Sequence, residues 1–484
     1  MAPEFSRISI GVPGLDEILR GGLIPRRTYL VRGGPGVGKT ILGLHFLDIS
    51  VRQGEAALFL TFGESEGELR VNARLAGFAL GDLAFLDISP SSGQFAEERS
   101  YDIFPPSEVE REPVTRRIRE TVASLKPARI FVDGMTQLRR LSPNAFQFRG
   151  EALAFLRFLC ESGATVLFTS ESAEGEDDDL QFIADAVIHL ELLAGRRRLS
   201  VVKFRGSDFR AGYHTLRLCD RGMEVFPRLL PSEFSADFAP EPISFGLPEL
   251  DRLTHGGLER GAISIITGPS GVGKSTLGMQ FVSAAAARGE RAAVYLFEEW
   301  PETLIRRCRG IKIPVEAMIE SGMVRLEHIE PLYFTGDEFA RMVRREVEER
   351  NTRVVMIDSV SGYRLSVADQ DLVGQLHALG KYLQNMGVAV LLINEVERIT
   401  GDFRVTDVGV SYVADNIIFL RYLELRGEMA KAIGVLKKRL SDFEKTLREF
   451  AITPEGIRIG GPLRGLRGIL SGNPEWAEGE PPAR

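Results

Sequence analysis

The sequence predicts an α/β protein of two tandem, homologous domains, each a mainly parallel sheet flanked by helices. The chain has 484 residues, more than one hydrophobic core usually organises. Residues 8–47 match residues 243–282 without a gap, so the chain repeats itself. Apolar runs such as TYLVRG, RIFVDG and TVLFTS alternate with helix-like stretches. That alternation is typical of parallel strands covered by helices.

The register of the repeat sets the domain boundaries. Lys39 and Lys274 are 235 positions apart, as are Glu64 and Glu299, and the match continues with small slips to the end of each half. Between the halves lies a proline-rich stretch without helical or strand periodicity. We therefore expect four parts: an N-terminal domain, a linker, a C-terminal domain and a tail, at 1–230, 231–242, 243–462 and 463–484.

Composition narrows the class of protein. With 44% hydrophobic and 26% charged residues, the chain is of ordinary globular type. Its net charge of −7 disfavours a nucleic-acid partner, because such partners require a basic surface. Neither a long apolar run nor a signal peptide is present, so we expect a cytoplasmic protein without membrane contact. The three scattered cysteines do not suit a disulfide framework or a zinc site.

Each half contains one glycine-rich loop of the pattern GxxxxGK[ST], placed after an apolar strand and at the start of a helix. This is the context of a phosphate-binding loop, whose backbone N–H groups surround phosphate at the positive end of a helix. We expect the lysines to reach the β- and γ-phosphates of ATP and the hydroxyls of Thr40 and Ser275 to ligate Mg²⁺. The predicted nucleotide-binding residues are Gly36, Gly38, Lys39, Thr40, Ile41, Gly271, Gly273, Lys274, Ser275 and Thr276.

An aspartate ends a buried strand in each half. Asp133 follows ARIFV and Asp358 follows TRVVMI. An aspartate at this position of a phosphate-binding domain belongs to the magnesium site. The alternative is an aspartate that only caps a turn.

Paired carboxylates follow another apolar strand of the second half. Glu298 and Glu299 end VYLF, whereas the first half has Gly63 and Glu64 at the matching positions. Beside bound nucleotide, one carboxylate can deprotonate an attacking oxygen and the other can bind magnesium. We therefore predict Glu298, Glu299 and Glu64 as catalytic residues and Glu299 also as a metal ligand. The alternative is a solvated acidic turn.

Two basic side chains occupy one face of a late strand in each half. They are Lys203 with Arg205, and Lys437 with Arg439. Such pairs can stabilise γ-phosphate charge in the nucleotide site of a neighbouring subunit. The alternative is a solvated strand face.

These motifs resemble the KaiC family, the two-domain RecA-like ATPases of the circadian clock. The resemblance covers nearly the whole chain and includes GVPGLDEILRGGL, GLPELDRLTHGGL, YLELRGEMAKAIGVLKKR and GILSGNP. It implies two RecA-like domains and six subunits in a double ring with ATP at the subunit interfaces. It also implies that Lys203, Arg205, Lys437 and Arg439 reach a neighbour's nucleotide, and that a KaiB-like or histidine-kinase protein is a partner.

The resemblance further implies that the C-terminal domain transfers the γ-phosphate to hydroxyl residues across the subunit interface. The acceptor positions fall on Ser411 and Tyr412, with Glu298 as general base and Glu299 as its acidic partner. Two positions depart from the family pattern. In the C-terminal domain, Tyr412 replaces a serine or threonine. In the N-terminal domain, Gly63 replaces the first glutamate and Glu64 is the only carboxylate, so we expect slow or lost hydrolysis in that ring.

The predicted function is therefore a hexameric ATPase and serine autokinase in a clock or signalling timer, with ATP and Mg²⁺ as cofactors. One alternative is a nucleotide-dependent ring that acts as a signalling scaffold without a phosphorylation cycle. A RecA-like motor on DNA is the third possibility, which the acidic charge disfavours.

Overall fold

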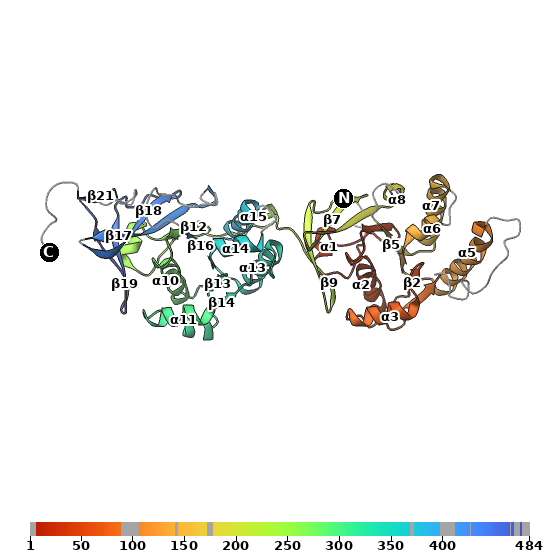
Figure 1. Cartoon of the computed structure of the whole chain (residues 1–484), viewed down its shortest axis with the longest axis horizontal. Helices are drawn as coiled ribbons and strands as arrows, with labels where there is room; N and C mark the ends of the chain where they lie inside the picture. Colours follow the sequence, from red (N-terminus) through yellow and green to blue (C-terminus); the bar gives the residue numbers. More distant parts are fainter. Residues whose placement is uncertain are drawn as a thin grey trace. The chain divides into compact units, whose positions relative to one another are not determined.

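The computed structural model describes residues 6–88, 106–140, 144–171, 178–367, 372–396, 412–425, 427–464, 466–468 and 475–476. The chain divides into two compact units, Met1–Arg228 and Leu229–Arg484. Each unit contains a nine-stranded, mostly parallel sheet with helices on both faces (Figure 1). This confirms the predicted fold class.

The sheet of the first unit has six parallel strands followed by three antiparallel ones. Its central strands are apolar at nearly every position, because both faces are covered. In sheet order the strands are β3 (Ala84–Asp87), β2 (Ala57–Thr61), β4 (Arg129–Asp133), β5 (Thr165–Glu171), β1 (Thr28–Gly33), β6 (Ala186–Leu193), β7 (Arg196–Phe204), β8 (Tyr213–Cys219) and β9 (Gly222–Phe226).

Helices cover the two faces of this sheet as separate sets. One face packs against α1 (Leu15–Ile18), α2 (Lys39–Arg52) and α3 (Glu66–Leu75). The other face packs against the second set of helices. That set comprises α5 (Pro106–Leu125), α6 (Met135–Arg140), α7 (Ala145–Glu161) and α8 (Asp178–Ile183).

The second unit repeats the strand order of the first without exception. In sheet order its strands are β14 (Val324–His328), β13 (Ala292–Leu296), β15 (Val354–Asp358), β16 (Ala389–Glu395), β12 (Ile263–Gly268), β17 (Asn416–Leu425), β18 (Glu428–Lys438), β19 (Arg448–Thr453) and β20 (Gly456–Pro462). Two short pairs lie outside it, namely β10 (Pro242–Ile243) with β11 (Leu258–Glu259), and β21 (Leu466–Arg467) with β22 (Glu475–Trp476).

Its helices again form two sets, which Figure 1 shows around α10 and around α13 to α15. The first set comprises α9 (Pro248–Leu253), α10 (Lys274–Ala287), α11 (Pro301–Arg309) and α12 (Val315–Glu320). The second set comprises α13 (Gly336–Arg350), α14 (Val360–Ser366) and α15 (Leu372–Asn385).

The repeated opening motif of each unit has a structural role. Asp16 accepts hydrogen bonds from the Ser9 hydroxyl and the Ile10 N–H, and Asp251 makes the same two bonds in the second unit. A Cβ on Gly22 would overlap the carbonyl of Ile8. The motif therefore folds each N-terminal segment back onto its own domain.

The residues between the repeats pack against the second unit. They begin with the 3₁₀ turn η1 (Pro231–Glu233), and Phe234 meets Tyr382 edge to face at 5.1 Å. The Asn385 side chain donates to the carbonyl of Pro231 over 2.9 Å. This proline-rich stretch thus includes an ordered attachment to α15. None of the helices in the described parts of the chain is long and apolar enough to cross a membrane.

Each sheet has two edges across the strand direction. The carboxyl edge is where the parallel strands end, and the amino edge is where they begin. Both glycine-rich loops leave the carboxyl edge, after Gly33 in β1 and after Gly268 in β12. Ligands of open α/β sheets bind at this edge.

Candidate nucleotide-binding sites

The two glycine-rich loops present uncapped helix ends to the space above the sheet. Gly38 and Gly273 are the N-caps of α2 and α10, with φ of 107° and 115°, and neither helix start has a side-chain cap. The positive φ of Gly273 would strain any side chain there, and a Cβ would lie 2.5 Å from Cδ1 of Ile452 and 3.1 Å from the Phe450 ring. The free N–H groups of these helix ends are suited to phosphate.

In the first unit, a hydroxyl and a carboxylate meet beside the lysine. The Thr40 hydroxyl donates to Oδ2 of Asp133 over 2.8 Å. The Thr169 hydroxyl donates to Oδ1 of the same aspartate over 2.7 Å. Lys39 donates to the carbonyls of Gly33 and Gly34, and burial lowers the pKa of its ammonium group. The loop, the lysine and the strand-end aspartate of the first unit thus lie close together.

In the second unit, the same groups line a cavity of about 280 Å³. Lys274 donates to the carbonyl of Pro269 over 2.8 Å and lies 3.6 Å from a carboxylate oxygen of Glu395. Burial lowers the pKa of Lys274, and the Glu395 and Asp358 carboxylates oppose that shift. Of the other predicted residues, Gly271, Gly273, Ser275 and Thr276 line this cavity. In the first unit, the Ile41 side chain instead packs against the hydrophobic core.

Asp358 has a pKa well above the usual value for an aspartate. Burial raises the pKa of its carboxyl to about 6, although a hydrogen bond from Ser275 and the charges of Arg307 and Lys274 oppose the shift. Its Oδ2 is buried and accepts no hydrogen bond. A buried carboxylate oxygen without a donor is costly unless a cation or its water completes the site.

The paired glutamates line the same cavity and have different partners. Glu298 accepts a hydrogen bond from the Ser359 hydroxyl over 2.7 Å. Glu299 forms a two-bond ion pair with Arg307, with N···O distances of 3.1 and 2.9 Å. In the first unit, burial and then the Asp133 and Glu68 charges raise the pKa of Glu64.

The basic pairs lie at the amino edge, away from the loops of their own domains. Lys203 donates to the carbonyls of Gln181 and Ala184, and Arg205 donates to that of Phe182. In the second unit, Lys437 donates to the carbonyl of Ala414 and Arg439 to that of Tyr412. Within each domain, the structure therefore does not bring the basic pair to the nucleotide site.

Of the two predicted phosphoacceptors, Ser411 lies outside the described residues. Tyr412 is 53% exposed and lies at the amino edge, just before β17. Its ring faces His377 with a centroid separation of 6.4 Å. The second predicted acceptor thus shares an edge of the sheet with Lys437 and Arg439.

The donor set of each site fits Mg²⁺. Hydroxyl and carboxylate oxygens are the hard ligands that this ion prefers, and Asp358, whose Oδ2 accepts no hydrogen bond, lines the second cavity. Among the described residues, no group of three or more His, Cys, Asp or Glu side chains can hold a metal by itself. Magnesium typically needs only one or two carboxylates plus phosphate oxygens and water. Bound there, it would neutralise developing charge on the β- and γ-phosphates.

Sequence reasoning missed four residues that contact the predicted groups, namely Thr169, Arg307, Ser359 and Glu395. The repeat contained a signal for one of them. Glu171 and Glu395 both end the strand that pairs with the loop strand. The others become visible only when separate strands and helices are brought together.

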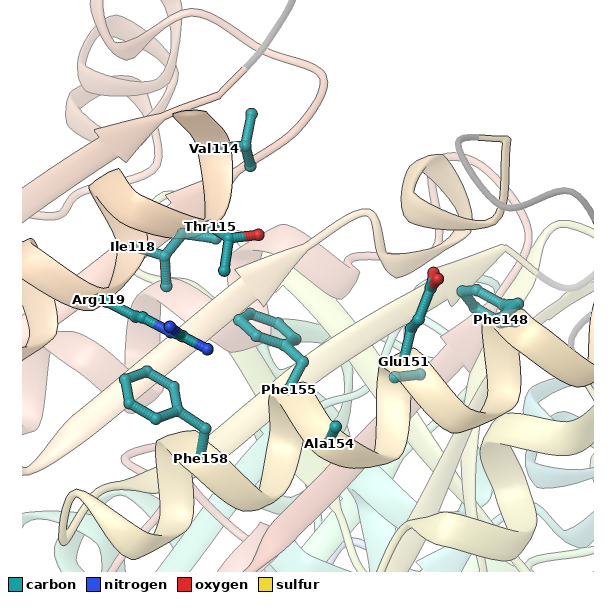
Figure 2. Close-up of a pocket in the computed structure, with 10 residues that line it drawn as sticks. Val114, Thr115, Ile118, Arg119, Phe148, Glu151, Ala154, Phe155 and Phe158 are labelled. Atoms are coloured by element: carbon teal, nitrogen blue, oxygen red, sulfur yellow. The ribbon is translucent and has the colours of Figure 1, made fainter. Parts of the chain in front are cut away.

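A second hollow of the first unit lies between α5 and α7, with a volume of about 340 Å³. Figure 2 shows Phe155 and Phe158 directed toward Ile118 and Arg119 across it. Its wall is mostly apolar and includes none of the predicted site residues. It is therefore separate from the phosphate-binding loop.

Comparison with known proteins places both halves in one family. A profile of the KaiC ATPase family matches residues 8–229 and 243–464. The circadian clock protein KaiC3 of Synechocystis sp. is 29% identical over 98% of this chain and 95% of its own length. The circadian clock oscillator protein KaiC of Synechococcus elongatus is 28% identical over 96% of this chain and 91% of its own length.

Two mostly parallel sheets, each with a glycine-rich loop, a hydroxyl and an aspartate at the carboxyl edge, define a tandem P-loop nucleotide-binding protein. The chain belongs to the KaiC ATPase family. It is a KaiC-like ATP-binding protein whose two domains are both of the ATPase type.

Proposed function

We propose that this protein is a ring-forming ATPase whose C-terminal domain is also a serine autokinase, acting on Ser411 of the neighbouring subunit. The active form is a homohexamer in a double ring, and the phosphorylation serves a clock or signalling timer. The observation that carries the proposal is the shared location of Tyr412, Lys437 and Arg439 at the amino edge of the second sheet.

The amino edge is far from the loop of the same domain. The strand β12 begins at the amino edge, where Ile263 bonds to Asp415, and ends at Gly268 beside the loop. Five residue steps at about 3.3 Å each separate the two edges by roughly 17 Å. A head-to-tail contact between subunits joins different edges of the same domain, and repetition of that contact closes a ring. Such a contact delivers the basic pair and the acceptor to the next subunit together.

The second site supplies the chemistry of phosphoryl transfer. Glu298 accepts the proton of the Ser411 hydroxyl while the Ser411 oxygen forms a bond to the γ-phosphorus of ATP. The bond between that phosphorus and the bridging oxygen breaks, and ADP leaves. The hydrogen bond from Ser359 fixes one oxygen of Glu298. Lys274 from this chain and Lys437 and Arg439 from the neighbour stabilise charge on the phosphoryl oxygens.

The N-terminal domain has a narrower role in this proposal. Glu64 is exposed and its partner position is Gly63, so one carboxylate acts alone. We propose slow hydrolysis there and nucleotide binding that holds the ring together.

Intact mass and site mapping after incubation with Mg²⁺ and ATP test the proposal. We expect one added phosphate on the peptide that contains Ser411 and Tyr412, assigned to Ser411. A Glu298→Gln variant should lose roughly 100-fold or more of the rate, as for removal of a general base. Glu64→Gln removes the lone glutamate of the other half, at the position that matches Glu299, and should leave the rate of Ser411 phosphorylation nearly unchanged.

Mixed rings test transfer between subunits. A Ser411→Ala chain lacks the proposed serine acceptor, and a Lys274→Ala chain has no functional donor site. Phosphate on the Lys274→Ala chain, seen only after mixing, is the expected result. An unmodified wild-type chain that still hydrolyses ATP and assembles would overturn the kinase role and favour the scaffold.

A further inference from the structure

The strand-end aspartates of the two sites are held differently. Asp133 accepts one hydroxyl hydrogen bond at each carboxylate oxygen, from Thr40 and from Thr169. The Thr169 oxygen in turn accepts the N–H of Gly134 over 2.8 Å, which commits the Thr169 proton to Asp133. The aspartate of the first site is therefore fixed by protein groups at both oxygens.

The second site lacks one of these two donors. In the sheet, Asp358 pairs with Ile393 of β16, just as Val132 pairs with Phe168, the residue before Thr169. Ile393 thus occupies the place of Thr169, and it is buried in the cavity wall. An isoleucine side chain donates no hydrogen bond, which explains why Oδ2 of Asp358 is buried without a partner.

We propose that Thr169 is a positioning residue for the magnesium site of the first domain, and that Ile393 leaves Asp358 to be held by the metal and its water. Partners that fix a metal-site ligand typically change metal affinity 10- to 100-fold. The first site then retains nucleotide at low free Mg²⁺, whereas the second site fills and empties as free Mg²⁺ changes. This difference in magnesium response is a property of the ATP-binding sites and does not depend on autophosphorylation.

The two sites share several groups around their lysines, although Glu298 and Arg307 belong to the second site only. Both sites have a hydroxyl after the lysine, an aspartate at the end of the next strand but one, and a glutamate at the end of the strand between them. Thr169 and Ile393 differ in whether they can donate. A reciprocal exchange between them is therefore the direct test.

The experiment measures binding of a fluorescent ATP analogue to the full chain while free Mg²⁺ is titrated. A Lys274→Ala background reports the first site, and a Lys39→Ala background reports the second. We expect the first site to be half-filled at roughly tenfold lower Mg²⁺ than the second. Thr169→Val should raise the midpoint of the first site about tenfold, and Ile393→Thr should lower that of the second.

Thr169→Ser keeps the donor and should keep the wild-type midpoint, which separates positioning from packing. Thermal melting without nucleotide identifies any variant that fails to fold. If Thr169→Val does not fold, the Mg²⁺ midpoints of Thr169→Ser and Ile393→Thr test the proposal. Equal midpoints in the two wild-type sites would overturn the proposal. So would a Thr169→Val variant that weakens nucleotide equally at all Mg²⁺ concentrations, or an Ile393→Thr variant with an unchanged midpoint.

Discussion

The two halves of this protein have the same strand order, yet their nucleotide sites are equipped differently. The first site holds its aspartate with two hydroxyls and has a single exposed glutamate nearby. The second has a buried aspartate with one unpartnered oxygen, two glutamates with separate partners, and Arg307 in the cavity wall. A duplicated backbone therefore fixes where a site lies, while a few side chains determine what each copy does.

Removal of each loop lysine should have the largest effect and tests whether the two sites bind independently. Lys39→Ala and Lys274→Ala each remove a cation that contacts phosphate, so affinity at that site should fall roughly 100-fold. Calorimetric titration with Mg-ATP should then show one tight site per chain instead of two. A single substitution that abolished both binding events would contradict independent sites.

A glutamate at position 63 would give the first site the same pair of carboxylates as the second and would test their role in ATP hydrolysis. A Cβ at Gly63 would meet no atom within 4 Å, so the backbone accepts a side chain there. In a Lys274→Ala background, Gly63→Glu should raise ATP hydrolysis by the first site roughly 10- to 100-fold, the range expected for a positioned base. Phosphate release measures the effect, with Gly63→Ala as the control. An unchanged rate would mean that Glu64 alone is sufficient.

Acid should destabilise the first unit more than the second. His45 and His214 are buried, and burial lowers the pKa of each imidazole from 6.5 to about 4. Each ring accepts a backbone N–H, from Met223 and Arg228, so protonation breaks a hydrogen bond. Gln280 takes the place of His45 in the second unit.

The sign follows from these depressed values. As the pH falls below 6.5, the unfolded chain takes up protons first, so stability is lost between pH 6.5 and 4, by about 3 kcal/mol for each histidine. Both tryptophans, Trp300 and Trp476, belong to the second unit. Far-UV circular dichroism should therefore change at a higher pH than tryptophan fluorescence, and His45→Gln should narrow the gap. Coincident transitions would refute the assignment.

A smaller difference is expected in the helices that follow the loops. A Cβ on Gly43 of α2 would overlap the Phe131 ring, whereas one on Gly278 of α10 would lie 2.8 Å from the flexible Met356 side chain. Gly43→Ala should cost about 1–3 kcal/mol, as for an overpacked core, and Gly278→Ala should cost less. Chemical denaturation of the two variants measures both. Equal losses in the free energy of unfolding would indicate that the Phe131 ring moves aside as easily as the Met356 side chain.

Sequence patterns were sufficient for the fold class and for the glycine-rich loops. Apolar runs predict strands that are covered on both faces of a sheet. The glycine-rich loop motif predicts a strand before it and a helix after it. The same patterns say nothing about the partners of Glu298 and Glu299. Ser359 follows a different strand and Arg307 belongs to α11, so their contacts depend on how the elements pack.

By itself, the sequence determined the repeat, the parallel sheets, and the residue types presented to phosphate and magnesium, because these follow from local periodicity and spacing. Only the tertiary structure decided that Thr169 holds Asp133 while Ile393 leaves Asp358 without a second donor. It likewise decided that Lys437 and Arg439 lie at the edge opposite their own loop. The physical reason is that hydrogen bonds between strands depend on pairing register and burial, which residues distant in sequence set jointly.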